Sequence, residues 1–221
     1  MAINFQLPGA EHRTTVIGMT GTGKTVFGAW LLSKQRFDKR PWIVIDFKDE
    51  ELWDRVKEPS IRPLKLGDMP GKLGLYRLRV DPWNLDALEE YLKKIWSHGN
   101  IGLFVDEVSL IPQKDAFKAI LRQGRSRLIP VIACTQRPVD CDREVFTESN
   151  YMAVFKLKDL RDYKTVEQIT GTKGTERPLP EHWSWWYDAK QNALFPLKPC
   201  PPPDIVAAAL RQVAPVSWWN R

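Results

Sequence analysis

The stretch GMTGTGKT, Gly18–Thr25, decides the fold of this chain. It follows the β-branched run Arg13–Gly18, which predicts a strand, and it opens Lys24–Ser33, where apolar spacing predicts a helix. A glycine-rich loop between a strand and a helix, ending in Gly-Lys-Thr, is typical of a phosphate-binding loop. Its glycines let consecutive N–H groups turn towards phosphate oxygens, and the start of the helix adds partial positive charge.

This loop predicts ATP as the ligand and Mg²⁺ as its companion. Lys24 is expected to reach the β- and γ-phosphates, and the hydroxyl of Thr25 is expected to ligate Mg²⁺. The alternative is a glycine-rich turn that matches the pattern by chance. The predicted nucleotide-binding residues are Gly18, Met19, Thr20, Gly21, Thr22, Gly23, Lys24, Thr25 and Val26.

An acidic pair, Asp106-Glu107, follows the apolar run Ile101–Val105. A buried strand that delivers a carboxylate at its carboxyl end is the second half of many nucleotide sites. Asp106 is expected to hold Mg²⁺ through its water shell, and Glu107 to polarise a water for attack on the γ-phosphate. A second carboxylate favours hydrolysis over phosphoryl transfer to a small molecule. The alternative is a solvated acidic turn.

A further polar residue, Gln136, follows the predicted strand Ile129–Cys134. Because the carboxyl ends of parallel strands meet at one edge of a sheet, Gln136 is expected near Asp106. It could bond to the attacking water or to the γ-phosphate. The alternative is a loop residue that only satisfies backbone groups.

Strand-like and helix-like segments alternate through most of the chain. The apolar run Trp42–Phe47 is continuous, as in strands that are buried on both faces of a parallel sheet. The pattern predicts one α/β domain with a mostly parallel central sheet. In the helix expected over Asp86–Ser97, Asp86 and Glu89 resemble a capping box. Further strands are expected at 76–80 and 153–157, a hairpin at 185–188 and 193–197, and further helices at 114–123, 159–170 and 204–213.

Composition sets wide limits on the class of protein. The chain has 221 residues, of which 43% are hydrophobic and 27% charged, so a globular fold is expected. It has no apolar run of about 18 residues, so no membrane span is expected, and its first residues do not resemble a signal peptide. Three cysteines without CxxC spacing favour a reducing compartment. The net charge of +6 favours a polyanionic partner such as nucleic acid or an anionic membrane surface.

Together, four motifs resemble the FtsK/HerA superfamily of P-loop ATPases. They are GMTGTGKT (18–25), IDFKDE (45–50), LFVDE (103–107) and CTQRP (134–138), and the strand ending in Asp46-Phe47-Lys48 is the most family-specific of them. The resemblance covers about residues 13–170 and implies a RecA-like (ASCE) P-loop core with strand order 5-1-4-3-2. The chain looks most like the genome-packaging ATPases of tailless, membrane-containing double-stranded DNA viruses.

The same resemblance implies a homo-oligomeric ring, a hexamer or pentamer, that moves double-stranded DNA. Rings of this type use an arginine of the neighbouring subunit at the transferring phosphate. Arg125 is the first candidate and Arg127 the second, with Arg122 and Arg137 behind them; the alternative is a solvated or DNA-facing basic patch. Candidates for contact with DNA phosphates are Lys114, Lys156, Lys158, Arg161 and Lys164.

The C-terminal residues form a distinctive segment. We expect an ATPase core over 1–180, followed at 181–221 by a hairpin, a proline-rich break, a short helix and a Trp-rich tail that is not an independent domain. Trp183, Trp185 and Trp186 are expected to pack the hairpin on the core. Trp218 and Trp219 could pack within the chain, dock on a neighbouring subunit or on a capsid or vertex protein, or lie at a membrane surface.

The leading hypothesis is an ATP-hydrolysing motor that packages a viral genome into a preformed capsid, located at a unique virion vertex and in the host cytoplasm; a cellular relative would be cytoplasmic. Three alternatives stay open. One is an assembly or secretion ATPase of the filamentous-phage type, which normally carries a membrane segment. The second is a small-molecule P-loop kinase. The third is a virion component that binds ATP without turnover.

Overall fold

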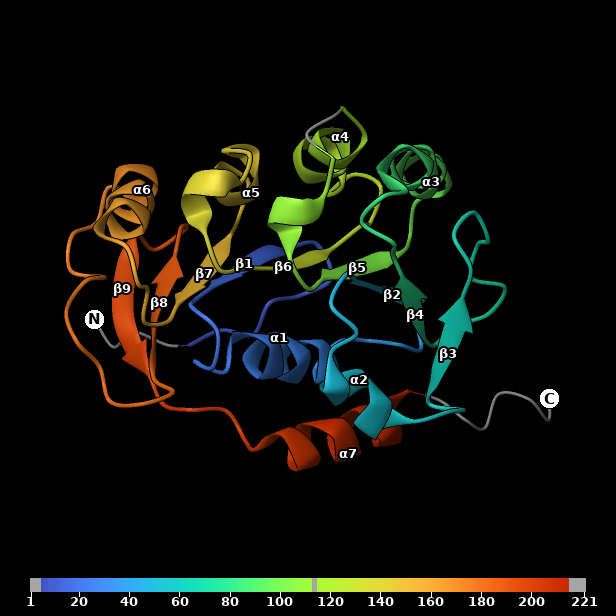
Figure 1. Cartoon of the computed structure of the whole chain (residues 1–221), viewed down its shortest axis with the longest axis horizontal. Coiled ribbons are helices and arrows are strands. Elements are labelled where there is room, and N and C mark those ends of the chain that lie inside the picture. The colour runs from blue at the N-terminus through green and yellow to red at the C-terminus, as the bar shows by residue number, and fades with distance from the viewer. Residues whose placement is uncertain (1–4, 113–114, 215–221) are drawn as a thin grey trace.

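A nine-stranded sheet forms the centre of the computed structural model, which describes residues 5–112 and 115–214 (Figure 1). Seven strands are parallel, and β8 and β9 extend the sheet antiparallel beyond β7. In spatial order the strands are β3 (Ile61–Leu64), β4 (Leu75–Arg79), β2 (Trp42–Asp46), β5 (Gly102–Val105), β6 (Val131–Thr135), β1 (Arg13–Ile17), β7 (Tyr151–Val154), β8 (Ser184–Asp188) and β9 (Ala193–Leu197).

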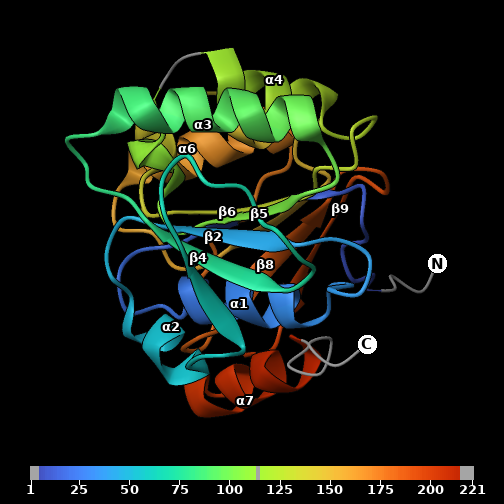
Figure 2. The same cartoon turned by 90° about the vertical axis from the view of Figure 1, so that its right-hand side faces the viewer.

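Helices cover both faces of this sheet (Figures 1 and 2). On one face lie α1 (Lys24–Ser33), α2 (Glu51–Val56) and α7 (Pro203–Val213). On the other lie α3 (Leu85–His98), α4 (Asp115–Gln123), α5 (Glu144–Thr147) and α6 (Leu160–Thr170). Within the described residues, no helix has the length and hydropathy that crossing a membrane requires.

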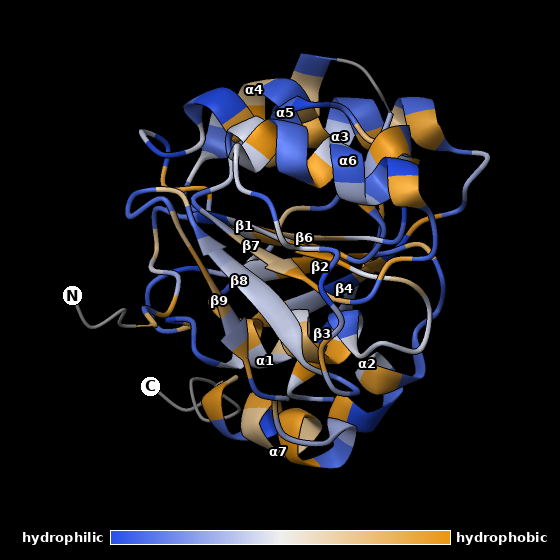
Figure 3. Ribbon diagram, turned by 90° about the vertical axis from the view of Figure 1, so that its left-hand side faces the viewer, coloured by the Kyte–Doolittle hydropathy of each residue, from blue (hydrophilic) through white to orange (hydrophobic). Residues whose placement is uncertain are grey.

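The sheet separates two hydrophobic cores. On β2, Ile43 and Ile45 pack into the core under α3 to α6, whereas Trp42 and Val44 pack into the core over α1, α2 and α7. Successive side chains of a strand point to opposite faces, so a strand between two helical layers is apolar throughout. Figure 3 shows hydrophobic residues along the central strands β1, β6 and β7, between the two helical layers.

The predicted fold class is confirmed. Counted in chain order without β3 and β4, the strands β7, β1, β6, β5 and β2 stand in the order 5-1-4-3-2. The chain forms one α/β domain in which every βαβ connection returns the chain parallel to its start. The carboxyl ends of β1, β2, β5 and β6 therefore lie along one edge of the sheet.

The C-terminal residues are closely joined to the rest. Strand β8 pairs with β7, and Trp186 on β8 is fully buried beside Phe27 and Tyr151. Helix α7 packs against α1 and α2, where Asp204 pairs with Arg55 at 2.8 Å. Trp218 and Trp219 lie outside the described residues. The boundary near residue 180 stays a prediction.

Three short elements and one cap differ from the sequence-based expectations. Helices α2 and α5 and strand β3 were not predicted, because each is four to six residues long. The predicted capping box of α3 is wrong: its N-cap residue is Asn84 and not Asp86, and the Asn84 side chain makes no capping hydrogen bond. Glu89 is instead buried, and its Oε1 accepts a hydrogen bond from Ala116 N at 3.0 Å, so it caps α4.

We predict that Gly102→Ala destabilises the protein. Gly102 is the register partner of Trp42, and a Cβ at this position would lie 2.2 Å from the buried indole ring. The ring has to shift in a packed core, so the free energy of unfolding should fall by roughly 1–3 kcal/mol. Denaturant titration measures this loss. Gly71→Ala is the control, because a Cβ there meets nothing within 4 Å; equal denaturation midpoints for the two variants would contradict the packing argument.

Candidate active site

The glycine-rich loop lies between β1 and α1, at the carboxyl edge of the sheet. Gly21 and Gly23 have φ angles of 82° and 91°, which favour glycine. At Gly18 a Cβ would lie 2.7 Å from both Phe155 Cβ and Thr22 Oγ1, so a side chain does not fit there. The first N–H groups of α1, including that of the predicted residue Val26, have no partner within the helix and are available to an anion.

The structure brings Thr25 and Asp106 together although 81 residues separate them. Thr25 Oγ1 donates to Asp106 Oδ1 at 2.9 Å, and Asp106 Oδ2 is buried with no hydrogen-bond partner among the described residues. Burial, together with the nearby Glu50 carboxylate, raises the pKa of Asp106 to about 7, although Thr25, Lys24 and Lys48 oppose the shift. A buried carboxylate without full compensation is stabilised by a cation.

These two side chains fit a magnesium ion. Mg²⁺ prefers oxygen ligands and is commonly held by one or two protein groups together with water and phosphate oxygens. A hydroxyl and a carboxylate with an unpaired buried oxygen supply that set. Residues 5–112 and 115–214 contain no cluster of three His, Cys, Asp or Glu that could hold a metal, so phosphate oxygens would have to complete this site.

Glu107 lies in a network of donors next to Asp106. Its Oε1 accepts hydrogen bonds from Ser109 Oγ at 2.8 Å, Thr135 Oγ1 at 3.0 Å and Gln136 N at 3.2 Å. Its Oε2 forms an ion pair with Lys48 Nζ at 2.5 Å. Burial raises the pKa of Glu107, but the hydrogen bond and charge of Lys48, together with the hydrogen bonds from Ser109 and Gln136, hold this pKa below its usual value. Glu107 is therefore a carboxylate at neutral pH.

Gln136 joins this network to the glycine-rich loop. Its backbone N–H bonds to Glu107, and its side-chain Oε1 accepts from Thr20 Oγ1 at 2.7 Å. The predicted residues Lys24, Thr25, Asp106, Glu107 and Gln136 thus lie together at one edge of the sheet.

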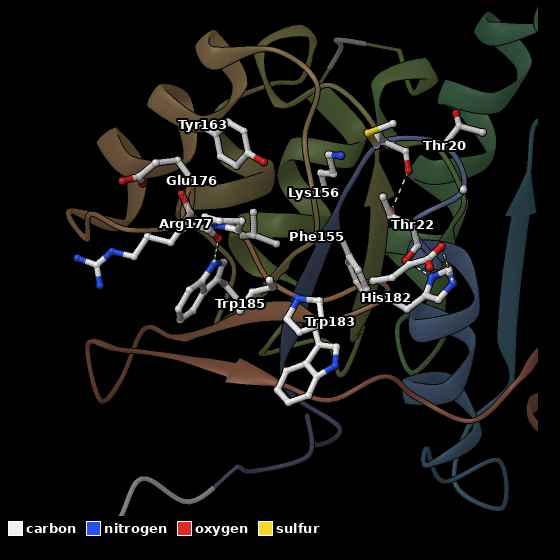
Figure 4. Close-up of a pocket in the computed structure, with 18 residues that line it drawn as sticks. Thr20, Thr22, Phe155, Lys156, Tyr163, Glu176, Arg177, His182, Trp183 and Trp185 are labelled. Atoms are coloured by element: carbon white, nitrogen blue, oxygen red, sulfur yellow. Dashed lines mark hydrogen bonds and ion pairs between the residues drawn. The ribbon is translucent and has the colours of Figure 1, made fainter.

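Sequence reasoning missed His182, which lies between two cavities beside the loop. Its Nδ1 is 3.2 Å from the carbonyl oxygen of Thr22, 160 residues away, and no local pattern signals that contact. A cavity of about 640 Å³ lies between the loop, Glu50 and Pro199–Pro203. A second, of about 530 Å³, is lined by Lys156, Arg177, His182 and Trp183, as Figure 4 shows. Trp183 and Trp185 both line this cavity, and Trp185 is also partly packed on the core.

Arg125 and Arg127, the first two predicted arginines, do not reach this chain's own glycine-rich loop. They lie between α4 and the start of β6, at the amino edge of the sheet, whereas the loop follows the carboxyl end of β1. Arg125 pairs with Glu11 at 3.3 Å, and the Arg127 guanidinium stacks on Trp96 at 3.8 Å. Arg122 pairs with Glu144. Arg137 follows β6 at the carboxyl edge and lies 3.6 Å from Asp162.

The candidate DNA contacts lie mostly around β7 and α6. Lys156, Lys158, Arg161 and Lys164 are exposed, and Arg161 pairs with Asp159 at 2.8 Å. Lys114 lies outside the described residues. Because these side chains are exposed, each of them could contact DNA phosphates. Their exposure does not indicate which of them does so.

Comparison with known proteins identifies one relative by sequence and several proteins of similar structure. The chain is 35% identical over 217 residues to the DNA packaging ATPase P9 of Enterobacteria phage PRD1, which covers 93% of this chain and 95% of that protein. No protein-family model matches the chain.

Solved structures share the fold. The genome packaging NTPase B204 of Sulfolobus turreted icosahedral virus 2, in complex with AMPPCP, aligns with a TM-score of 0.68 at 17% identity, over 87% of this chain and all of that one. EssC (ATPases 2 and 3) of Geobacillus thermodenitrificans aligns with a TM-score of 0.64 at 11% identity, over 92% of this chain and 44% of that one. The near-complete match to P9, in a chain that assembles the glycine-rich loop with the acidic pair, shows that this protein belongs to the family of viral DNA packaging ATPases.

Proposed function

We propose that the protein hydrolyses ATP to ADP and phosphate and uses the energy to move double-stranded DNA into a preformed viral capsid. The observation that carries this proposal is the bond between Thr25 and Asp106, with the ionised Glu107 beside it, in a chain 35% identical to a DNA packaging ATPase. Both motifs of an ATP site meet there at hydrogen-bonding distance.

In this proposal each residue of the carboxyl edge has one role. The N–H groups of residues 18–26 and the ammonium of Lys24 bind the phosphates. Thr25 and Asp106 hold Mg²⁺, which would neutralise charge on the β- and γ-phosphates. Lys24, Thr25 and Asp106 are all buried, so their charges and dipoles act in an environment of low polarity.

Glu107 and Gln136 would orient the attacking water. The Glu107 carboxylate is fixed by two donors at the end of β6, Thr135 Oγ1 and Gln136 N, and Gln136 connects it to Thr20 of the glycine-rich loop. A phosphate that bonds to Thr20 would therefore shift Gln136, and Gln136 would report the state of the nucleotide to Glu107. This arrangement supports hydrolysis over transfer to a small molecule.

The amino-edge position of Arg125 and Arg127 is compatible with action in trans. A side chain at that edge can reach a nucleotide only on a neighbouring copy, as in a head-to-tail ring of six or five subunits. In such a ring the exposed basic side chains would face DNA phosphates without reading sequence.

We further propose that residues 181–221 are an integral part of the ATPase and not an independent domain, and that they contact a capsid or vertex protein. The pairing of β8 with β7 and the packing of α7 on α1 and α2 support the first part. The proposed location is the virion vertex, and the host cytoplasm before packaging.

The first expected outcome is ATP hydrolysis that double-stranded DNA stimulates. Phosphate release is measured with and without linear duplex DNA, together with a search for phosphorylated small molecules. Free phosphate with DNA stimulation supports the motor. Hydrolysis that no DNA concentration stimulates under ring-forming conditions would contradict it, and a phosphorylated acceptor would favour a kinase.

The second concerns Glu107→Gln. The amide keeps the size of the side chain but loses the charge that orients water, so turnover should fall at least about a hundredfold while ATP affinity is retained. Phosphate release and titration with a fluorescent ATP analogue measure the two quantities. Glu90→Gln, on the exposed face of α3, is the control. Turnover comparable to the wild type would remove Glu107 from the mechanism.

The third tests the trans arginine by complementation. Arg125→Ala and Lys24→Ala should each be inactive alone, whereas mixed rings should regain hydrolysis, because an intact loop can meet an intact Arg125 across one interface. Phosphate release from a mixing series measures the recovery, and Arg36→Ala serves as an exposed control. Full activity of Arg125→Ala alone, or mixed rings that stay inactive, would exclude Arg125; the same series then applies to Arg127.

A further inference from the structure

Asp162 is a buried carboxylate to which the proposed function assigns no role. It lies in the first turn of α6 and is 2% exposed. An acidic residue in this place commonly stabilises its own helix, but here Asp159 is the N-cap residue and accepts the capping hydrogen bond from Arg161 N at 2.9 Å. Burial of a carboxylate is unfavourable unless the group is paired and hydrogen-bonded, so the partners of Asp162 indicate what it does.

The partners of Asp162 in the described part of the chain belong to the segment that follows Gln136. Asp162 Oδ1 accepts a hydrogen bond from Val139 N at 3.2 Å, and its Oδ2 lies 3.6 Å from Arg137 Nε. Arg137 Nη2 is also 3.8 Å from Asp159 Oδ2. Two acidic residues at the start of α6 therefore hold the turn after β6.

This turn, residues 137–140, has few other attachments. Pro138 has no N–H group, and Arg137 N donates to the adjoining Thr135 Oγ1 at 3.2 Å. Among the described residues, the hydrogen bonds and ion pairs of residues 137–140 to the rest of the chain reach only Thr135, Cys141 and the start of α6. The start of α6 is thus the one distant part of the fold to which the turn is bonded.

Helix α6 is itself anchored beside the glycine-rich loop. Tyr163 Oη accepts a hydrogen bond from Leu157 N at 2.8 Å, just after β7. The preceding residue, Lys156, accepts a hydrogen bond on its carbonyl oxygen from Met19 N at 3.0 Å. The glycine-rich loop, the end of β7 and α6 are therefore joined by hydrogen bonds, and a turn attached to α6 is held at a fixed place relative to that loop.

The position of Gln136 depends on this attachment. Its N–H donates to Glu107 Oε1 at 3.2 Å, and its Oε1 accepts from Thr20 Oγ1. A donor–acceptor distance of 3.2 Å is near the long end for a hydrogen bond, so a small displacement of the backbone breaks it. Release of Val139, three residues further on, would allow that displacement.

We propose that Asp162 is a positioning residue for Gln136: it fixes the turn after β6 to α6 and so holds Gln136 between Thr20 and Glu107. The inference rests on the proposed role of Gln136 in ATP hydrolysis. Asp162 acts through the Val139 N–H group and the Arg137 guanidinium, and not on the nucleotide.

The first test measures the position of Gln136 without any turnover. Asp162→Asn keeps the shape of the side chain and an acceptor for Val139 N–H, but it removes the charge that faces Arg137. Amide hydrogen exchange of the nucleotide-free protein, followed by NMR, should be about tenfold faster at Gln136 N–H, the scale of one charge-assisted hydrogen bond. The amides of β1 should exchange as in the wild type.

Asp188→Asn is the matched control. Asp188 is also 2% exposed and accepts hydrogen bonds from Gln191 N at 3.0 Å and Gln191 Nε2 at 2.6 Å, in the turn between β8 and β9. This variant should leave exchange at Gln136 unchanged. An unchanged rate at Gln136 in Asp162→Asn, or an equal acceleration throughout β1, would overturn the positioning role.

The second test is a double-mutant cycle on turnover. Asp162→Asn should lower the kcat for phosphate release about tenfold, while the KM for ATP and the affinity for duplex DNA stay close to the wild type. In a Gln136→Ala background, the same substitution should lower kcat no further, because its effect passes through Gln136. An equal further fall in the double variant would show that Asp162 acts independently of Gln136.

The two tests separate this inference from the proposed function. A wild type that does not hydrolyse ATP overturns the proposed function, whereas exchange at Gln136 still decides whether Asp162 positions it. If Asp162→Asn does not fold, Arg137→Met takes its place in the exchange experiment, because the Arg137 side chain is 48% exposed and tolerates substitution. It should also accelerate exchange at Gln136 N–H, and an unchanged rate would overturn the attachment to α6.

Discussion

The hydrogen bond between Thr25 and Asp106 is the contact on which the site depends. It joins the start of α1 to the end of β5 across 81 residues, and it forms because β1, β6, β5 and β2 are parallel neighbours in register. Parallel strands bring their carboxyl ends to one edge. The side chains that follow each strand therefore meet, whatever their separation in the chain.

Two adjacent carboxylates at this edge have opposite electrostatics. Asp106 is buried with one unpaired oxygen, which raises its pKa to about 7, while Lys48 holds the pKa of Glu107 below its usual value. The first environment favours a cation, and the second keeps a charged group available to a water. The backbone turn after β5 directs neighbouring side chains into these two environments, so in the proposed mechanism one strand end would hold the metal and orient the water.

The parts of the fold that repeat a simple pattern could be predicted from sequence. The continuous apolar runs at β2 and β5 and the glycine-rich loop predict a parallel sheet with a phosphate site, and the structure has that sheet. Contacts set by tertiary packing could not be predicted. Glu89 caps α4 and not its own helix. His182 contacts Thr22 because the segment before β8 returns to the glycine-rich loop. The motif Asp46-Phe47-Lys48 is visible in the sequence. The ion pair between Lys48 and Glu107, however, follows only from the adjacency of β2 and β5.

ATP turnover at this edge is proposed to move the protein along DNA, and triplex displacement tests this proposal directly. A labelled oligonucleotide bound in the major groove of a linear duplex is released when a motor passes. We predict release by the wild type with ATP and Mg²⁺, and none with a non-hydrolysable ATP analogue or with Glu107→Gln. DNA-stimulated hydrolysis without any release, or release that does not need hydrolysis, would contradict the account.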